Sequence, residues 1–416
     1  MTSPRFPLAL AATVVAIFGV SASPNSLRAS AQTPPPVRLA SPDAGSKTPE
    51  SGPAKPAIIA YVFPRNELIV PSEISAGKLT HINYAFADVK DGRIVEGSAR
   101  DAENFKLLAD LRRQHPHLQI LISVGGWTWS GNFSDAALTT ESRRRFTRSA
   151  IDFVRRHDID GVDIDWEYPG LRGNNNVHRP EDKENFTAMM TDLRQALDAE
   201  GRARNRRYLL TFAAGAFPDF IAKTEMDKVQ AVVDFVNLMT YDFRTSDPIA
   251  GHHANLYPHP ADTKKRSVDS AVREFIAAGV PPAKVVVGVP FYGRAWADIK
   301  GEGTGLYQPG SRPTERIETK YGPMSTTLID RGGFVRIWDS QAQAPYLWNK
   351  DTRTFISYED PESLRLKSAY IREKGLGGAM FWEYYGDKTG VLLDTLFTTL
   401  HGQVSVPRRP VASSSF

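Results

Sequence analysis

The most informative segment of this sequence is Asp160-Gly161-Val162-Asp163-Ile164-Asp165-Trp166-Glu167-Tyr168-Pro169-Gly170. Along its middle part, apolar and β-branched residues alternate with carboxylates, a pattern typical of a β-strand. Successive side chains of a strand point to opposite faces, so Asp163, Asp165 and Glu167 project from one side. Three carboxylates on one face repel each other and are costly to bury without hydrogen bonds or positive charge. We therefore predict that this strand is either an exposed acidic edge or the floor of an active site.

Strand-like apolar runs alternate with amphipathic stretches along most of the chain. The predicted strands are Ile58–Phe63, His81–Ala87, Gln119–Val124, Ile159–Trp166, Leu209–Ala214, Phe235–Thr240, Val285–Phe291 and Gly378–Trp382. The predicted helices are Ala102–Gln114, Glu141–His157, Pro180–Glu200, Ser267–Ala278, Pro361–Lys374 and Thr389–Leu400. This alternation predicts an α/β protein with a parallel sheet. Eight strands in one domain favour a closed (β/α)8 TIM barrel, predicted over residues 57–402, more than an open doubly wound sheet.

One interval breaks this rhythm, because the seventh and eighth strands lie much further apart than one helix requires. Residues 297–358 contain short β-like runs, such as Phe334–Trp338 and Thr354–Ser357, and many turn residues. A structureless loop of that length is unusual in a compact domain. We therefore predict a small α+β insertion after strand seven.

The two ends of the chain differ in composition from the rest. Arg5 precedes the apolar run Leu8–Val20, and Ala29-Ser30-Ala31 offers a cleavage site, so residues 1–31 are predicted to be a secretory signal peptide. The alternative is an uncleaved N-terminal anchor, for which the run is short. Residues 32–56 are rich in Pro and Ser and are predicted to form a disordered linker, as is the tail 403–416. We expect a secreted protein, extracellular or periplasmic, without stable membrane association after cleavage.

Composition excludes several kinds of chemistry. The absence of cysteine excludes disulfides, thiolate catalysis and cysteine metal sites. A net charge of +4 over 416 residues, without a basic run interleaved with aromatics, gives no support to nucleic-acid binding. Asp158-Ile159-Asp160-Gly161 superficially resembles an acidic calcium motif, but the later ligands of that motif are missing. We therefore expect neither a metal nor a cofactor.

Polar and aromatic residues follow several strands at the point where each strand ends. These strand ends are Ser123-Val124-Gly125-Gly126-Trp127, Met239-Thr240-Tyr241-Asp242-Phe243, Pro290-Phe291-Tyr292-Gly293-Arg294 and Met380-Phe381-Trp382-Glu383. In a (β/α)8 barrel these ends meet at one mouth, together with the acidic strand. Aromatic faces beside acids and amides suit a neutral, polyhydroxylated ligand.

These motifs carry a family resemblance. Asp160 to Glu167 resembles the D-x-x-D-x-D-x-E signature of glycoside hydrolase family 18, the chitinases and their relatives. The motifs Ser123–Gly126, Met239–Phe243 and Gly377–Trp382 are similar to other signatures of that family and occur in the expected order. The resemblance extends over about Ala57 to His401, and the insertion resembles one that deepens the cleft in one subfamily.

The resemblance implies a retaining, substrate-assisted mechanism and a role for five residues. Glu167 would be the general acid and then the base, and the nucleophile would be the substrate's own 2-acetamido carbonyl. Asp165 would hold the acetamido N–H, and Asp163 could share a proton with Asp165 and raise the pKa of Glu167. Tyr241 would bind the acetamido oxygen, and Trp382 would form a stacking floor beneath the reacting sugar.

Further residues are predicted to contact substrate because they lie near the strand ends. They are Asp242, Met239, Tyr292, Arg294, Tyr61, Phe86, Gly126, Trp127 and Tyr168. The other tryptophans weighed as subsites, Trp129, Trp296 and Trp338, could equally pack in the core. Three further residues are assigned structural roles. Asp160 is predicted to make structural hydrogen bonds. His252 and His253, which are neighbours in the sequence, are predicted to lie on the surface or to pack within a loop. Many family members have a tryptophan after the first strand, and its absence here puts the remotest subsites on that side in doubt.

Three functions remain open from the sequence. The first is a secreted chitinase acting on β-1,4-linked N-acetylglucosamine in chitin or chitooligosaccharides, as a monomer. The second is cleavage of the chitobiose core of N-glycans, which the insertion disfavours because it would wall the cleft for a linear chain. The third is a non-catalytic chitin-binding lectin, which the presence of Glu167 disfavours.

Overall fold

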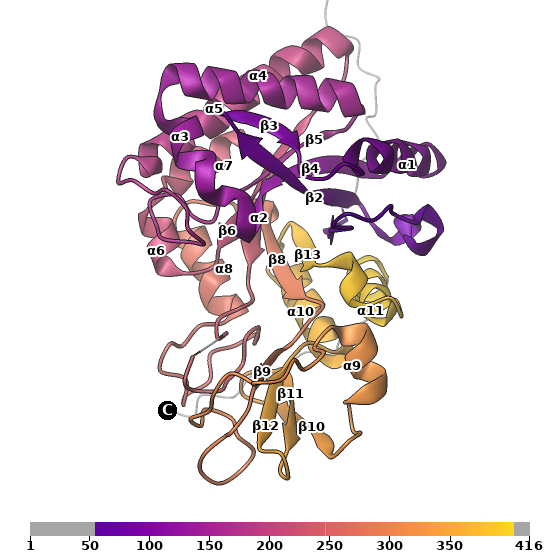
Figure 1. The fold of residues 1–416 in the computed structure, drawn as a ribbon, viewed down its shortest axis with the longest axis vertical. Helices are drawn as coiled ribbons and strands as arrows, with labels where there is room; N and C mark the ends of the chain where they lie inside the picture. Colours follow the sequence, from indigo (N-terminus) through magenta and orange to yellow (C-terminus); the bar gives the residue numbers. More distant parts are fainter. Residues whose placement is uncertain (1–54, 246, 403–416) are drawn as a thin grey trace, which may run out of the picture. The chain divides into compact units, whose positions relative to one another are not determined.

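Eight parallel strands form a closed barrel in the computed structural model, which describes residues 55–245 and 247–402 (Figure 1). The barrel strands are β1 (Ala57–Val62), β2 (His81–Lys90), β4 (Gln119–Gly125), β5 (Gly161–Asp165), β6 (Leu209–Gly215), β7 (Phe235–Met239), β8 (Val285–Pro290) and β13 (Gly378–Trp382). The circle closes because β1 pairs with both β13 and β2, all in parallel. The predicted (β/α)8 barrel is therefore confirmed.

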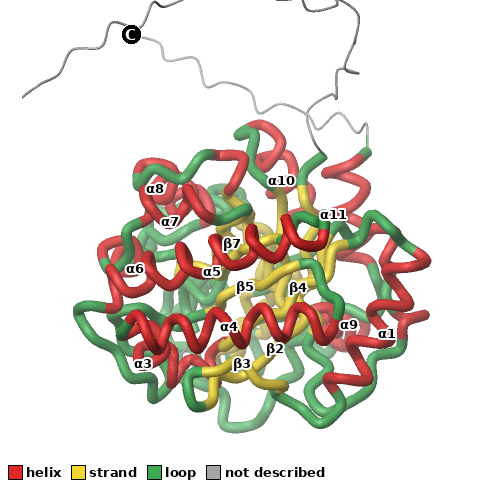
Figure 2. Tube along the Cα trace, turned by 90° about the horizontal axis from the view of Figure 1, so that it is seen from above, coloured by secondary structure: helices red, strands yellow, loops and turns green. Residues whose placement is uncertain are grey.

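Helices surround the strands on the outside (Figure 2). The long ones are α1 (Asp101–Gln114), α4 (Thr140–His157), α5 (Asp182–Arg204), α8 (Val268–Ala277), α10 (Pro361–Glu373) and α11 (Val391–His401), close to the predicted bounds. Capping boxes start α4, α8 and α10, where an N-cap side chain accepts a backbone N–H three residues later. The shorter α2 (Gly126–Trp129), α3 (Phe133–Leu138), α6 (Pro218–Ala222) and α7 (Met226–Val232) were not predicted.

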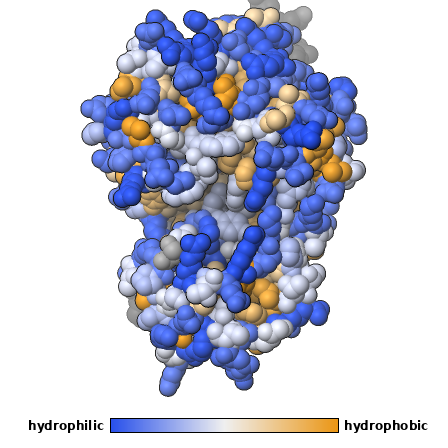
Figure 3. Space-filling view, viewed as in Figure 1, coloured by the Kyte–Doolittle hydropathy of each residue, from blue (hydrophilic) through white to orange (hydrophobic). Residues whose placement is uncertain are grey.

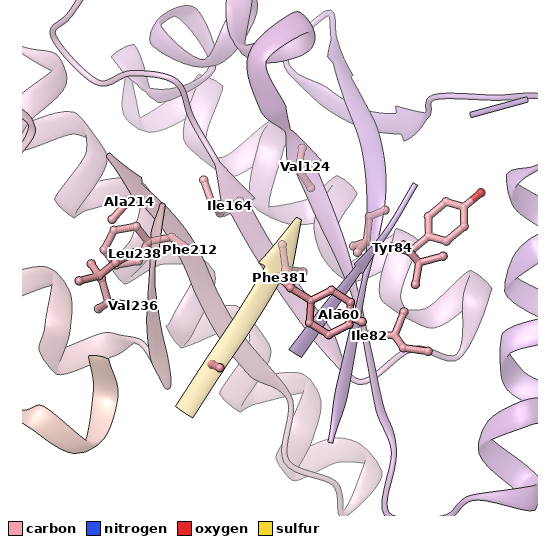
Figure 4. Packing of buried hydrophobic residues seen from close by; sticks show 14 of the residues in the cluster. Ala60, Ile82, Tyr84, Val124, Ile164, Phe212, Ala214, Val236, Leu238 and Phe381 are labelled. Carbon is pink, nitrogen blue, oxygen red and sulfur yellow. The ribbon is translucent and has the colours of Figure 1, made fainter. Parts of the chain in front are cut away.

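The main hydrophobic core lies between the barrel strands and the helices (Figure 4). On β5 the outward face carries Val162 and Ile164, both fully buried. Trp166 continues this face, stacking on Phe133 at 5.4 Å between ring centroids and meeting Phe186 edge-on at 6.0 Å. The predicted alternation is therefore confirmed, and it leaves the carboxylates of β5 for the barrel interior.

A second, antiparallel sheet lies between β8 and β13 in the sequence and below them in Figure 1. Its strands are β10 (Phe334–Asp339), β11 (Ala344–Asn349), β12 (Thr354–Ser357) and β9 (Arg294–Trp296), and α9 (Tyr321–Thr327) precedes β10. The strand β9 precedes residue 297, and the other elements of this sheet lie within the predicted segment 297–358. The strand β3 (Arg93–Glu96), which pairs with the end of β2 in antiparallel orientation, was not predicted. That the second sheet is the insertion of one subfamily stays a prediction.

The loop between β7 and α8 is fastened to this second sheet. His252 Nε2 lies 3.0 Å from a carboxylate oxygen of Asp339, and the backbone N–H of His253 donates to Ser357 Oγ at 2.9 Å. Both histidine side chains are fully buried. Their predicted role in loop packing is right, whereas a place on the surface was wrong.

The remaining predictions about the chain ends lie outside the described residues. These are the signal peptide 1–31, nearly all of the linker 32–56 and the tail 403–416. Within residues 55–245 and 247–402, no helix has the length and apolar character needed to cross a membrane.

Candidate active site

A cleft of about 1580 Å³ opens at the carboxyl ends of the barrel strands, visible as the hollow that crosses the face in Figure 3. Its wall includes most of the residues that the sequence analysis proposed: Phe86, Trp127, Asp165, Glu167, Tyr168, Met239, Tyr241, Asp242, Tyr292, Arg294 and Trp382. They come from loops and strand ends far apart in the sequence. The barrel topology brings them together because parallel strands end at the same mouth.

Asp163 lies beneath this cleft, inside the barrel and without solvent exposure. Its carboxylate accepts hydrogen bonds from Tyr61 Oη at 2.9 Å, Ser123 Oγ at 2.8 Å, Thr211 Oγ1 at 2.5 Å and Asn237 Nδ2 at 3.2 Å. Burial raises the pKa of Asp163, and the hydrogen bonds counteract part of that rise. The four donors hold the carboxylate in a fixed orientation under the site.

Asp165 is the next side chain on the same face and lies in the cleft wall. Burial, followed by the charges of Glu167 and Asp163, raises the pKa of Asp165 well above its ordinary value. Its Oδ1 atom is buried and has no hydrogen-bond partner among the described residues. A buried polar atom that faces a cleft and lacks a partner is suited to meet one on a ligand.

Glu167 follows the end of β5 and is 8% exposed. Its backbone N–H donates to Ser130 Oγ at 2.9 Å, and that hydroxyl lies 3.0 Å from the carbonyl oxygen of Asp165. Burial raises the pKa of Glu167 to about 7; the charge of Asp242 adds to this rise and a hydrogen bond from Tyr168 opposes it. A carboxyl group that titrates near neutrality can both give and take a proton.

Aromatic rings pack around Trp382 at one side of the cleft. The indole stacks on Phe86, with centroids 5.4 Å apart and an interplanar angle of 19°. Phe63 at 5.7 Å and Tyr61 at 6.0 Å pack against the same indole. These contacts fix the orientation of Trp382. Phe63 lines the cleft but was missed from the sequence, although it belongs to the aromatic pair that ends the first strand.

A second wall of the cleft contains an ion pair. Arg294 donates two hydrogen bonds to the carboxylate of Asp242, one of them at 2.7 Å from Nε. The guanidinium also lies 5.0 Å from the centroid of the Tyr292 ring, which meets Tyr241 edge-on at 6.2 Å. Burial works to raise the pKa of Asp242, but His253 and Arg294 outweigh it and hold that pKa below its ordinary value. Asp242 is therefore an ionised carboxylate in the wall.

Two of the residues proposed for substrate contact do not line the cleft. Tyr61 is 2% exposed and points its hydroxyl at Asp163, so it supports the acid network from below. Gly126 is buried, and a Cβ at this position would lie 2.7 Å from the ring of Phe86. Its missing side chain makes room for Phe86, whereas the neighbouring Gly125 lines the cleft.

Asp160 has the structural role that was predicted. It lies just before β5, at the opposite end of that strand from Glu167, and accepts hydrogen bonds from Arg112, Arg206 and the backbone N–H of Ile120. Because Asp163, Asp165 and Glu167 are all buried, β5 is not an exposed acidic edge.

The tryptophans divide between the cleft and the packing of the second sheet. Trp127, which is 53% exposed, and Trp129 line the cleft. Trp296 is buried, and its indole N–H donates to the carbonyl oxygen of Asp247. Trp338, on β10, lies against Arg336 and outside the cleft wall. Within the described ranges 55–245 and 247–402, no group of three or more His, Asp or Glu side chains is arranged to hold a metal ion.

Comparison with known proteins gives consistent matches. The family model of glycosyl hydrolases family 18 matches residues 58–387. Chitinase A1 of Niallia circulans is 39% identical over 398 residues, which cover 81% of this chain and 57% of that relative's length. A glycoside hydrolase family 18 N-acetylglucosaminidase from Paenibacillus barengoltzii is 44% identical, with a TM-score of 0.77 and coverage of 83% of this chain and 99% of that one. Chitinase ChiA74 from Bacillus thuringiensis is 35% identical, with a TM-score of 0.78 and coverage of 85% of this chain and 71% of that one. The fold, the position of the carboxylates and these matches together place the chain in glycosyl hydrolase family 18.

Proposed function

We propose that this protein hydrolyses β-1,4 bonds between N-acetylglucosamine residues in chitin or its oligomers, with Glu167 as general acid and base. The observation that carries the proposal is the buried carboxyl group of Glu167 at the carboxyl end of β5, with a pKa of about 7. At neutral pH such a group is protonated in a large fraction of molecules and can donate to the glycosidic oxygen. Once deprotonated, it can take a proton from the attacking water.

The other carboxylates of the cleft favour a nucleophile supplied by the substrate. In the described part of the chain, the cleft is lined by four carboxylates: Asp165, Glu167, Asp242 and Glu315. Asp242 is held by Arg294, and Glu315 lies on the exposed segment before α9. Burial, followed by the charges of Glu167 and Asp163, raises the pKa of Asp165 well above its ordinary value, which disfavours Asp165 as an anionic nucleophile. This leaves the 2-acetamido carbonyl of the sugar as the group that attacks C1, as in substrate-assisted glycosidases.

The bond changes then follow from the positions of these residues. Glu167 transfers its proton to the leaving oxygen while the acetamido oxygen forms a bond to C1, which gives an oxazolinium-type intermediate. The unpartnered Oδ1 of Asp165 accepts the acetamido N–H, and the hydroxyl of Tyr241 donates to the acetamido oxygen. Water next attacks C1 from the side of the departed group and gives its proton to Glu167, so the anomeric configuration is retained.

Product analysis on a series of chitooligosaccharides, with detection of the anomer first formed, tests this mechanism. We expect the β-anomer as the initial product and an activity loss of at least about a thousandfold in Glu167→Gln, since an amide N–H is not acidic enough to protonate the leaving oxygen. The matched control is Glu184→Gln, an exposed residue on α5, which is expected to keep wild-type activity. An initial α-anomer would contradict retention, and an active Glu167→Gln variant would contradict the assignment of the acid.

The size of the product is a second question that the relatives raise. One relative is named a chitinase and another an N-acetylglucosaminidase. The same assay separates release of chitobiose from release of single N-acetylglucosamine units. A glycoprotein assayed in parallel tests cleavage of N-glycan cores, and binding of chitin without turnover would favour a lectin.

We further infer that the protein is secreted as a monomer and does not remain on the membrane. The apolar N-terminal run and the cleavage motif Ala29-Ser30-Ala31 support secretion and release from the membrane. Cell fractionation, N-terminal sequencing of the mature protein and its mass in solution test the three parts separately.

A further inference from the structure

Asp242 occupies an unusual backbone conformation at the cleft wall. Its φ angle is +58°, in the left-handed region that residues other than glycine adopt uncommonly. The carboxylate has Arg294 on one side, as described above. His253, which was predicted to pack in a loop or on the surface, also lies next to this carboxylate.

The imidazole of His253 has a restricted set of neighbours. It is fully buried, and its Nδ1 atom lies 3.5 Å from Oδ1 of Asp242. Neither ring nitrogen has a hydrogen-bond partner among the residues that the structure describes. The ring also packs against Tyr292, with centroids 5.4 Å apart. Because buried polar groups are costly to leave unpaired, Asp242, whose carboxylate lies 3.5 Å away, is the candidate acceptor for a proton on Nδ1.

The backbone around His253 is held from three directions. Its N–H donates to Ser357 Oγ on β12 at 2.9 Å, and its carbonyl oxygen accepts the N–H of Phe243 at 3.1 Å. The carbonyl oxygen of the next residue, Ala254, accepts a hydrogen bond from Lys367 on α10. Lys367 is in turn paired with Glu359, and both side chains of this pair are 1% exposed. The backbone that carries the imidazole is therefore held in place next to Asp242.

Burial favours the neutral form of His253. The groups that face it are the carboxylate of Asp242 and the cations of Arg294 and Lys367. Burial lowers the pKa of His253, the two cations lower it further, and Asp242 opposes them without reversing the result. A neutral imidazole donates from one nitrogen only, so the choice of tautomer decides whether Asp242 receives a hydrogen bond.

We propose that His253 is a positioning residue: its neutral imidazole carries the proton on Nδ1, donates it as a hydrogen bond to Asp242, and with Arg294 fixes this carboxylate in the cleft wall. The role rests on the proposed glycosidase function, because it concerns the reaction at Glu167. The negative charge of Asp242 raises the pKa of Glu167, so a carboxylate that is free to turn away would weaken the general acid.

Kinetics of two variants test this role. His253→Phe keeps a ring of similar size but cannot donate, whereas His253→Asn places an amide N–H near the position of Nδ1. We expect kcat/KM of His253→Phe on a chitooligosaccharide to fall about tenfold, the usual scale for losing a hydrogen bond to a charged group. The alkaline limb of its pH profile should move to lower pH, since Glu167 loses its proton more easily. His253→Asn should recover most of both properties.

The same measurements in an Asp242→Asn background separate positioning from general packing. If His253 acts through Asp242, adding His253→Phe to Asp242→Asn should cause little further change in the pH profile. A wild-type pH profile for His253→Phe, equal losses in His253→Phe and His253→Asn, or the same shift of the alkaline limb in both backgrounds would overturn the proposal. Thermal unfolding of each variant identifies a loss of activity that comes only from a destabilised fold.

A readout that does not depend on turnover distinguishes this proposal from the proposed function. ¹⁵N NMR of histidine-labelled protein should show His253 as the Nδ1–H tautomer in the wild type and a changed Nδ1 resonance in Asp242→Asn. An Nε2–H tautomer in the wild type would overturn the positioning role even in an active enzyme. The Nδ1–H tautomer in a protein that cleaves no chitooligosaccharide would instead count against the proposed function alone.

Discussion

Replacing Glu167 with glutamine is expected to stabilise the folded protein at alkaline pH. The carboxyl group is 8% exposed, and its pKa rises from 4.5 to about 7 on folding because burial disfavours the charged form. Between these two values the folded state keeps a proton that the unfolded state has lost. The contribution of Glu167 to stability is therefore greatest below about pH 4.5 and is lost as the pH rises through about 7. Glutamine is neutral at every pH and removes this cost.

The size of the effect follows from the same shift. A tenfold change in a proton affinity corresponds to about 1.4 kcal/mol, so the rise in the pKa of Glu167 amounts to roughly 3 kcal/mol of destabilisation above pH 7. Partial relaxation of the site reduces this value, and we expect Glu167→Gln to gain about 1–3 kcal/mol over wild type at pH 8. Asp165 has a raised pKa for the same reason, so the variant keeps part of the pH dependence.

Urea unfolding at pH 5 and at pH 8 measures this difference in the free energy of unfolding. The comparison needs wild type, Glu167→Gln and the exposed control Glu184→Gln, whose difference from wild type should be small and nearly the same at both pH values. The advantage of Glu167→Gln should be large at pH 8 and small at pH 5. A Glu167→Gln variant that is no more stable than wild type at pH 8, or equally favoured at both pH values, would refute the reasoning about burial.

Three further substitutions distinguish a residue that supports the acid network, a residue that only stabilises the fold and a residue that contacts the sugar. Asp163→Asn should lower kcat at saturating chitooligosaccharide and the melting temperature together, because the amide cannot accept all the hydrogen bonds that the carboxylate receives. Asp160→Ala should cost about 2–4 kcal/mol in urea unfolding, since Arg112 and Arg206 lose their buried partner, while kcat/KM per folded molecule stays at the wild-type value. Trp382→Ala should raise KM about tenfold in steady-state kinetics through the loss of roughly 1.4 kcal/mol of apolar contact with the sugar.

The barrel and its acid network could be predicted because both depend on local pattern. Alternating side chains on β5 place Asp163, Asp165 and Glu167 on one face whatever the rest of the chain does. The strand-end motifs could be assigned to one mouth because parallel strands of a barrel all end there. The predicted strands accordingly match the observed ones within a few residues, except that β2 runs on to Lys90.

The errors and omissions concern contacts between distant segments. Tyr61 was placed in the cleft because it ends an aromatic strand, but its hydroxyl turns inward to a carboxylate 102 residues away. The burial of His253 depends on docking of its loop against β12, and no periodic pattern marks that contact. Ser130, which fixes the backbone of Glu167, lies in a short helical turn that the sequence does not distinguish from an ordinary loop.

The hydrogen bonds of Asp163 have a consequence for how the barrel reaches a single folded state. Ser123 and Thr211, two of its donors, are also its direct strand partners on β4 and β6. If either neighbouring strand paired with β5 two residues out of step, leucine, glycine or alanine would replace the hydroxyl group beside the carboxylate. Such an alternative pairing keeps the apolar pattern intact, because strands alternate with a period of two. It leaves a buried carboxylate short of a donor, at about 1–3 kcal/mol for each lost bond. The residue that underlies the acid network thus also selects the native alignment of three strands against competitors that hydrophobic packing alone would tolerate.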